Sequence, residues 1–430
     1  MKTLQVKALL FFARIHRCRS DSSSLVLAPG NCLYHFILLL CLWPSPALGE
    51  DWPNWRGPAR NGVSSETQWR HTWTVDVPKI LWKENIGVGF SATSVANGLL
   101  YTMGNTENLD TVYCLNAQTG ELVWKHSYDC PLDDRFFEGG PTSTPTVDGD
   151  RVYTLSRQGD LLCFDAPSGS IHWSFSIPND ADLRIPGWGF SSSPMVHEDR
   201  VVLNAGVAGM AIDKRNGTLL WKSGDGEAGY MTPHRLKIGE RWHALIASGK
   251  FYQCVDLESG QVGWKHRWLT TNGCNAADPI VHGDQVFISS GYGRGAAVLS
   301  FTDIAVKTIW ANKEMQNQLN SSVLVDGYLY GFDGDEGGDV QFKCLEFSSG
   351  QVQWSHPGLG AGSVMVADNH LVVLSETGEL SIAPVSHTAF VPASKTKVLE
   401  SKCWTVPVLC NGLIYCRNAS GEIACVNVRP

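Results

Sequence analysis

Tryptophan recurs along this chain at an almost constant interval. Eight of these residues are separated by 42, 49, 48, 43, 46, 44 and 50 positions: Trp82, Trp124, Trp173, Trp221, Trp264, Trp310, Trp354 and Trp404. A period near 46 residues is typical of proteins in which one small unit is repeated and stacked on its neighbours. The 430 residues are therefore expected to form one large repeat domain rather than several small domains.

A common phrase ends at most of these tryptophans. Residues 112–124 read VYCLNAQTGELVW, residues 162–173 read LCFDAPSGSIHW, and residues 253–264 read QCVDLESGQVGW. In each, an acidic or amide residue stands eight positions before the tryptophan and a glycine stands four before it. Alternating apolar residues predict a strand, glycine suits a tight turn, and the tryptophan then lies on the returning strand. The phrase predicts a β-hairpin.

A second pair of strands precedes each hairpin, as in residues 143–155 and 321–330, and four strands per repeat are typical of a β-propeller blade. Residues 405–428 supply three strands without a tryptophan strand of their own. Residues 80–86 form a tryptophan strand without a preceding hairpin. We predict that these two segments pair and close the ring, which leaves no open sheet edge. The expected fold is all-β, a single eight-bladed propeller over residues 50–430.

These repeats resemble the PQQ-like repeat family, which is related to WD40-like propellers and is shared by quinoprotein dehydrogenases and by the assembly factor BamB. The resemblance covers residues 52–428. Residues 51–64, DWPNWRGPARNGVS, resemble the start of a group of exported bacterial propellers, and residues 140–153 and 187–194 carry further matching phrases. The resemblance implies the fold, whereas function has to be argued from the site.

Residues 1–49 are expected to be a leader that directs export. Residues 32–43 are apolar, and Ala47 and Gly49 suit signal peptidase, so cleavage is predicted before Glu50. The apolar run is shorter than the roughly 20 residues that span a bilayer, so we expect no integral membrane protein. Without the leader, 29 basic and 41 acidic residues give a net charge of −12, which disfavours nucleic acid as a partner. We expect a monomer in the periplasm or cell envelope.

The repeated tryptophans are expected to pack between neighbouring blades. Five cysteines stand at equivalent repeat positions, where a small side chain is needed: Cys114, Cys163, Cys254, Cys344 and Cys425. Equivalent positions in different blades lie farther apart than the roughly 7 Å between Cα atoms that a disulfide allows, so these five are predicted to be free thiols. Cys403, Cys410 and Cys416 lie near an Asn-Gly turn, and a disulfide among them stays an open alternative.

The sequence carries no recognised catalytic signature. A quinoprotein dehydrogenase is expected to show two adjacent cysteines over PQQ and Glu, Asn and Asp residues around calcium, and no two cysteines are adjacent here. Residues 332–339 alternate Asp with Gly like the first half of a calcium loop, but the distal Glu is missing. We therefore assign no catalytic residue, no cofactor and no metal ligand, with PQQ kept as an alternative.

A ligand site, if present, is expected at the mouth of the channel, in the connections that lead into the innermost strands. Five residues in or beside such connections are the candidates for binding: Arg184, Trp188, His234, Asp278 and Arg294.

Three classes of function fit the sequence. The first is a non-catalytic binding or scaffold propeller of the cell envelope, similar in architecture to BamB, which would contact an envelope protein or a small polar or glycan ligand. The second is a PQQ-dependent oxidoreductase of the quinoprotein alcohol dehydrogenase type. The third is a carbohydrate-binding propeller that uses the channel mouth.

Overall fold

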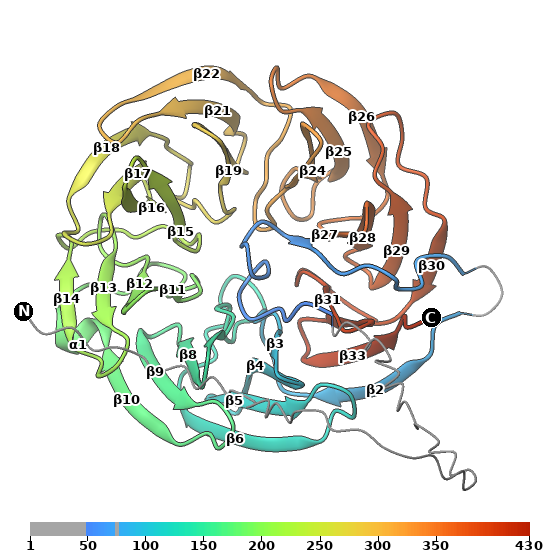
Figure 1. Cartoon of the computed structure of the whole chain (residues 1–430), viewed down its shortest axis with the longest axis horizontal. Helices are drawn as coiled ribbons and strands as arrows, with labels where there is room; N and C mark the ends of the chain where they lie inside the picture. The colour runs from blue at the N-terminus through green and yellow to red at the C-terminus, as the bar shows by residue number, and fades with distance from the viewer. Residues whose placement is uncertain (1–48, 74–76) are drawn as a thin grey trace, which may run out of the picture. The chain divides into compact units, whose positions relative to one another are not determined.

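The computed structural model describes residues 49–73 and 77–430, so the predicted leader and its cleavage signal lie outside the described residues. The described part of the chain is built from strands, with one short helix, α1 (Ile177–Ala181). Eight sheets surround a central channel in the order in which they follow along the chain (Figure 1). The prediction of an eight-bladed β-propeller is confirmed.

Six consecutive blades each contain four strands, ordered from the channel outward. Blades one to three contain β3 (Ser94–Ala96), β4 (Leu99–Thr106), β5 (Leu109–Asn116) and β6 (Leu122–Asp129); β7 (Thr146–Asp148), β8 (Arg151–Leu155), β9 (Asp160–Asp165) and β10 (Ile171–Ser176); and β11 (Met195–His197), β12 (Arg200–Leu203), β13 (Met210–Asp213) and β14 (Leu219–Lys222). Blades four to six contain β15 (His234–Ile238), β16 (Arg241–Ala247), β17 (Phe251–Asp256) and β18 (Val262–Arg267); β19 (Ile280–His282), β20 (Gln285–Ser290), β21 (Gly295–Phe301) and β22 (Val306–Asn312); and β23 (Val323–Val325), β24 (Tyr328–Asp333), β25 (Gln341–Glu346) and β26 (Val352–Pro357).

The last two blades each include a strand from the beginning of the described chain. Blade seven contains β27 (Ser363–Ala367), β28 (His370–Leu374), β29 (Glu379–Pro384) and β30 (Ser394–Lys397), and β1 (Val63–Ser64) joins its inner edge in parallel. Blade eight contains β31 (Val408–Cys410), β32 (Leu413–Arg417) and β33 (Glu422–Asn427), and β2 (Ile80–Asn85) is its outermost strand. Since β2 pairs antiparallel with β33, the predicted closure of the ring is confirmed.

The hairpin phrase forms the third and fourth strands of a blade, and its acidic or amide residue organises the turn. Asp165 Oδ2 accepts the backbone N–H of Ser168 (3.0 Å), and Asp256 Oδ1 accepts that of Ser259 (2.8 Å). The glycines that follow have φ of 72° at Gly169 and 73° at Gly260, a conformation that a side chain would strain. The recurring residues of the phrase are therefore those that the turn requires.

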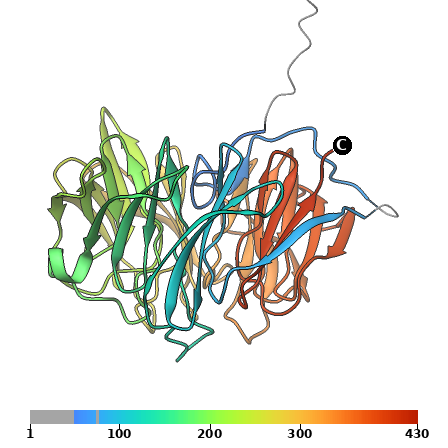
Figure 2. The same cartoon turned by 90° about the horizontal axis from the view of Figure 1, so that it is seen from below.

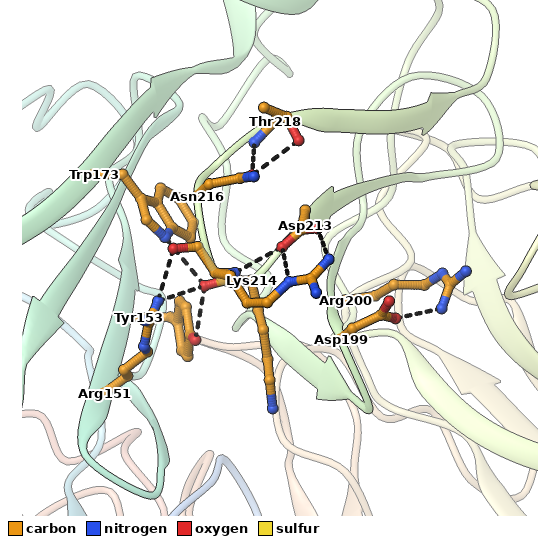
Figure 3. A network of polar contacts seen from close by, with 10 residues as sticks. Arg151, Tyr153, Trp173, Asp199, Arg200, Asp213, Lys214, Asn216 and Thr218 are labelled. Carbon is orange, nitrogen blue, oxygen red and sulfur yellow. Dashed lines mark hydrogen bonds and ion pairs between the residues drawn. The ribbon is translucent and has the colours of Figure 1, made fainter. Parts of the chain in front are cut away.

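Seven of the repeated tryptophans lie on outermost strands, and each joins its own blade to the following one. Each indole N–H donates to a backbone carbonyl in the turn of the following blade, at 2.8–3.2 Å: Trp82 to Ala117, Trp124 to Ala166, Trp173 to Lys214, Trp221 to Leu257, Trp264 to Thr302, Trp310 to Phe347 and Trp354 to Ser386. Figure 3 shows one such junction, where Arg151 and Tyr153 also donate to the Lys214 carbonyl. The buried apolar clusters likewise combine side chains of adjacent blades.

Trp404 is the exception, and its predicted place in an outermost strand is wrong. The outermost strand of blade seven is β30, which contains no tryptophan. Trp404 lies in the connection between β30 and β31, where its ring stacks on Phe90 with centroids 5.4 Å apart. The interval of 50 residues fits the repeat and therefore predicted a position at the outer rim. In the structure, the Trp404 side chain instead lines the channel mouth.

Residues 50–66, called the plug below, occupy the central channel and appear in blue at the centre of the ring in Figure 1. Trp52 forms a β-bridge with Val95 in blade one, β1 pairs with β27 in blade seven, and Glu66 accepts the N–H of Asn411 (2.7 Å) in blade eight. Figure 2 shows this segment and the C-terminus toward the same face of the ring. The prefix that suggested a family resemblance is therefore the part that fills the channel.

All ten cysteines of the described residues are buried free thiols. The expectation for the five equivalent cysteines is confirmed, and the disulfide left open among Cys403, Cys410 and Cys416 does not form. Within the described ranges, no helix has the length and apolar character needed to cross a membrane.

Candidate functional site

The connections into the inner strands share a position that lies two residues before each strand. Its side chain accepts a backbone N–H from the equivalent position of the preceding blade, at 2.7–3.0 Å: Ala92 to Thr144, Thr144 to Ser193, Ser193 to Thr232, Thr232 to Asp278 and Asp278 to Ser321. This belt of hydrogen bonds holds the connections together around the channel mouth. Asp278 is the one carboxylate among these six positions, which otherwise hold Ala92 and four Ser or Thr residues.

The second oxygen of Asp278 anchors the plug. Trp55 Nε1 donates to Asp278 Oδ2 at 2.5 Å, so one carboxylate serves both the belt and the channel segment. Asp278 is only 8% exposed. Burial raises the pKa of its carboxyl group, while the charge of Arg56 opposes the rise. Because both oxygens already accept hydrogen bonds from the protein, the carboxylate positions the Trp55 ring.

The Trp55 ring forms the floor of a cavity of about 200 Å³, which is open to solvent at the channel mouth. It is lined by connections from most of the blades, with Tyr292 and Glu336 added from the turns that follow β20 and β24. Its lining is aromatic and polar: Trp55, Phe90, Phe136, Phe137, Thr142, Trp188, Ser191, Ser193, Tyr230, Thr232, Cys274, Ala276, Asp278, Tyr292, Gln318, Leu319, Asn320, Glu336 and Trp404.

Six aromatic side chains from successive connections line one side of the mouth and are called the aromatic arc below. They are Trp404, Phe90, Phe137, Phe136, Trp188 and Tyr230. Phe90 contacts both Trp404 and Phe137, with centroids 5.4 and 5.6 Å away. Trp188 contacts Phe136 at 6.0 Å and Tyr230 at 5.6 Å. The arc therefore presents several ring faces and edges to one cavity.

The opposite side of the cavity is polar. Gln318 accepts the backbone N–H of Glu336 at 2.6 Å, and its amide donates to the hydroxyl of Tyr292 at 3.4 Å. The amide of Asn320 donates to the carbonyl of Gly362 at 2.9 Å. These partners fix the amide groups, whose remaining acceptors and donors are available at the cavity wall.

A buried arginine supports the rim of the aromatic arc. Arg157 is 2% exposed, and it donates to the carbonyl of Trp188 (2.9 Å) and to Asp133 Oδ2 (3.1 Å). Its guanidinium also lies over the ring of Phe137, 5.0 Å from the centroid. Arg157 therefore fixes two of the connections that carry the arc.

The electrostatics of the cavity are acidic. No lysine or arginine is among the lining residues, whereas Asp278 and Glu336 are. Partial burial raises the pKa of Glu336; Lys402 opposes this rise, and Glu138 and Glu376 increase it. Lys402 itself pairs with Glu138 at 2.9 Å and lies over the Trp404 ring. A ligand of this cavity therefore meets no unpaired cation on its walls.

The cavity offers no activated nucleophile. Its one thiol is Cys274, which is 7% exposed, and burial raises the pKa of that thiol to about 11. The group is protonated at neutral pH, and it is the thiolate that reacts. Burial likewise raises the pKa of Tyr292 to about 12.

The five residues suggested by the sequence separate into two groups. Trp188 and Asp278 line the cavity. Arg184 is exposed and pairs with Asp225 at 2.9 Å, and Arg294 stacks on Trp268 with its guanidinium 3.4 Å from the ring centroid. His234 begins β15 inside the channel, beside the arginines of the plug. The structure thus brings two of the candidates together in the mouth and places the other three elsewhere.

Several lining residues were missed at the level of sequence. The pair Phe136 and Phe137 stands in a polar, glycine-flanked loop, and an aromatic pair in such a loop is a usable signal. Trp404 was assigned to a strand because of its spacing. The inward position of Trp55 depends on the plug, whose path no local pattern indicates.

Comparison with known proteins agrees with this architecture. Residues 108–356 match the family model described as outer membrane protein assembly factor BamB. The match covers more than half of the chain, and the protein belongs to this family of PQQ-like β-propellers. No curated protein sequence matches the chain at a significant level.

Solved structures with the same fold include BamB and several dehydrogenases. BamB from Moraxella catarrhalis has a TM-score of 0.60 at 13% identity, over 82% of this chain and 100% of that one. A europium-containing methanol dehydrogenase has a TM-score of 0.66 at 11% identity, over 86% and 88%. Quinohemoprotein alcohol dehydrogenase from Comamonas testosteroni has 0.65 at 14% identity, over 88% and 80%. At these identities the likeness shows the fold alone.

Proposed function

We propose that this protein is a non-catalytic binding propeller of the cell envelope, whose mouth cavity binds one ring of a neutral carbohydrate. The observation that carries the proposal is the pairing of an aromatic arc with a polar wall in a cavity that no lysine or arginine lines. Aromatic faces suit the apolar C–H face of a sugar ring, and fixed amides suit its hydroxyl groups.

The size of the cavity supports a ligand with one inserted ring. An apolar cavity of about 150 Å³ accommodates benzene, so about 200 Å³ accommodates a single six-membered ring. Phe136, which is 63% exposed, extends the aromatic surface to the outer rim, where further rings of an oligosaccharide would lie.

The lining does not suit pyrroloquinoline quinone, the cofactor that the enzymes with this fold suggest. That cofactor is a polycarboxylate and calls for basic side chains, yet the charged groups on these walls are Asp278 and Glu336. Within the described residues, no three His, Cys, Asp or Glu side chains lie close enough together to hold a metal ion. We therefore derive no redox step at this site.

An envelope location is part of the same proposal. It rests on the predicted leader of residues 1–49 and on the family, whose described member is an outer membrane protein assembly factor. Fractionation of the producing cell, followed by N-terminal sequencing of the mature protein, tests it. Recovery in the cytosol with residues 1–49 intact would contradict it.

Calorimetric titration with neutral hexoses and N-acetylhexosamine oligomers tests the binding function. We expect saturable binding that is lost in Trp404→Ala and in Trp188→Ala, since each substitution removes one face of the arc. Trp354→Phe, which changes a tryptophan at the outer rim, is the matched control and should bind as the wild type does. Absence of binding to every sugar would refute the carbohydrate assignment.

A parallel titration with pyrroloquinoline quinone and calcium separates the two classes of function. We expect no change in the absorbance spectrum of the quinone and no rise in the melting temperature of the protein. Saturable binding of the quinone that Trp404→Ala abolishes would overturn the proposal and indicate an oxidoreductase.

A further inference from the structure

The plug carries two buried arginines into the channel below the floor of the mouth cavity. Arg56 is 4% exposed and Arg60 is 6% exposed. Both have positive φ, 62° and 57°, so the backbone adopts an uncommon conformation that directs these side chains inward. A buried cation is costly unless it is paired and fully hydrogen-bonded.

Their hydrogen bonds are incomplete. Arg56 Nη2 donates to the carbonyls of Ser322 (2.6 Å) and Asn61 (3.0 Å), and Arg60 Nη2 donates to Asn54 Oδ1 (2.9 Å). Arg56 Nε, Arg56 Nη1 and Arg60 Nη1 are buried and have no partner among the described residues. Three charged donor atoms are thus left without an acceptor in the part of the chain that the structure describes.

The charges are also unbalanced. Asp278 is the carboxylate whose charge acts on both Arg56 and Arg60, and it already accepts hydrogen bonds from Trp55 and Thr232. Arg235 lies close enough that its charge lowers the pKa of Arg60, which burial reduces to about 10. Burial and these arginines lower the pKa of His234 to about 3, so that ring is neutral. Two buried guanidinium groups therefore share one carboxylate.

A second cavity gives access to this cluster from the end of the channel opposite the mouth. Its volume is about 370 Å³, and Arg60, Arg235, Asn54 and Asn97 are among its lining residues. It is bordered by the ends of β3 and β7, whereas the mouth cavity is bordered by the connections that precede the inner strands.

Two carboxylates also line this cavity, and each has a partner. Asp148 pairs with Lys214 at 2.6 Å, and Asp51 accepts the backbone N–H of Asn97 at 3.1 Å. Arg60 and Arg235 are thus the lining cations for which the described residues provide no ion pair.

We propose that this second cavity binds a small inorganic oxyanion, phosphate or sulfate, between Arg60 and Arg235. A guanidinium group presents its donors in a planar fork that matches two oxygens of such an ion. The bound ion supplies the missing negative charge and accepts from the unpaired donor of Arg60. The site is separate from the mouth cavity, and its occupancy does not depend on the proposed carbohydrate function.

Thermal unfolding at constant ionic strength tests the proposal, with phosphate or sulfate exchanged for chloride. The wild-type melting temperature should rise with oxyanion concentration, because an ion that binds only the folded state stabilises it. Isothermal titration with inorganic phosphate measures the affinity directly. Arg60→Met should weaken that affinity at least about tenfold, which corresponds to about 1.4 kcal/mol.

Two further variants keep the test decisive. Arg235→Met removes the exposed partner without disturbing the buried plug and should also weaken phosphate binding, so the test stands if Arg60→Met fails to fold. Arg215→Met removes an exposed arginine that pairs with Asp213, away from the channel, and should leave phosphate binding unchanged. No oxyanion effect on the wild type, or an equal effect in all four proteins, would overturn the proposal, as would a crystal structure grown in phosphate that shows only water beside Arg60.

Discussion

At the scale of single residues, the repeated carboxylate of the hairpin phrase has an identifiable structural task. Asp213 accepts the backbone N–H of Arg215 (2.8 Å) and forms a two-pronged ion pair with the guanidinium of the same residue. The hydrogen bond from the Arg215 side chain lowers the pKa of Asp213 to about 2. Turn geometry and charge thus act together at this position.

Asp213→Asn should therefore change the pH dependence of stability. A carboxyl group whose pKa is lowered on folding stabilises the folded state above its unfolded pKa of about 4, and this contribution disappears as the pH falls toward 2. Arg215 is 67% exposed, so we expect a loss of only about 0.5–1 kcal/mol at pH 7. Urea unfolding of both proteins from pH 7 to pH 2 measures it.

Asp199→Asn is the matched control, because Asp199 also pairs with an arginine, Arg200, in the same network but is exposed, whereas the Asp213 side chain is only 7% exposed. The Asp199 side chain is 48% exposed, and we expect a change within about 0.5 kcal/mol. A difference between wild type and Asp213→Asn that stays constant down to pH 2 would contradict the assignment.

At the scale of elements, the sequence predicted the position of the mouth cavity better than the residues that line it. The connections into inner strands were predicted from the repeat alone, because strand order within a propeller blade is fixed by topology. Two of the candidates named in this way, Trp188 and Asp278, line the cavity. Trp404 was missed because an irregular connection can supply an aromatic residue at the interval of a strand, and periodicity alone cannot separate the two cases.

The rim loop that carries Phe136 and Phe137 should depend on Arg157. Arg157→Met removes the hydrogen bonds to Trp188 and Asp133 while keeping a long apolar side chain, so residues 131–140 should become more accessible. Limited proteolysis should cleave this loop several-fold faster, and binding at the mouth cavity should weaken. Arg135→Met, which removes the exposed partner of the same Asp133, is the control and should leave the cleavage rate near that of the wild type. Equal rates for both variants would show that Arg157 does not hold the loop.

At the scale of the whole molecule, ring closure was predictable because both of its halves were visible in the sequence as incomplete blades. The path of the plug was not predictable, because a segment without a periodic sequence pattern is positioned by its contacts with the ring that surrounds it. The charge of its two arginines could be read from the sequence, but their burial could not.

The closing strand β2 should contribute more to the stability of the fold than the outermost strand of any other blade. Replacing Ile80–Asn85 by a Gly-Ser segment of equal length leaves β33 as an open edge and removes the contact of Trp82 with blade one. We expect a loss of at least about 3 kcal/mol and self-association visible by light scattering. The same replacement at Ser394–Lys397 removes an outermost strand without opening the ring and should cost less. Equal losses would mean that the ring gains nothing from being closed.

The plug also has a consequence for the order in which this protein is completed. Residues 50–66 leave the ribosome before any blade, yet they contact blades one, two, five, six, seven and eight, and the last of these is made at the end of synthesis. Trp55, whose indole ring forms the floor of the mouth cavity, is held by Asp278, a residue more than 200 positions later in the chain. In a chain interrupted before blade five, this segment has only its contacts with blades one and two. The mouth cavity, which is proposed as the ligand site, is then still without the residues that the later blades contribute.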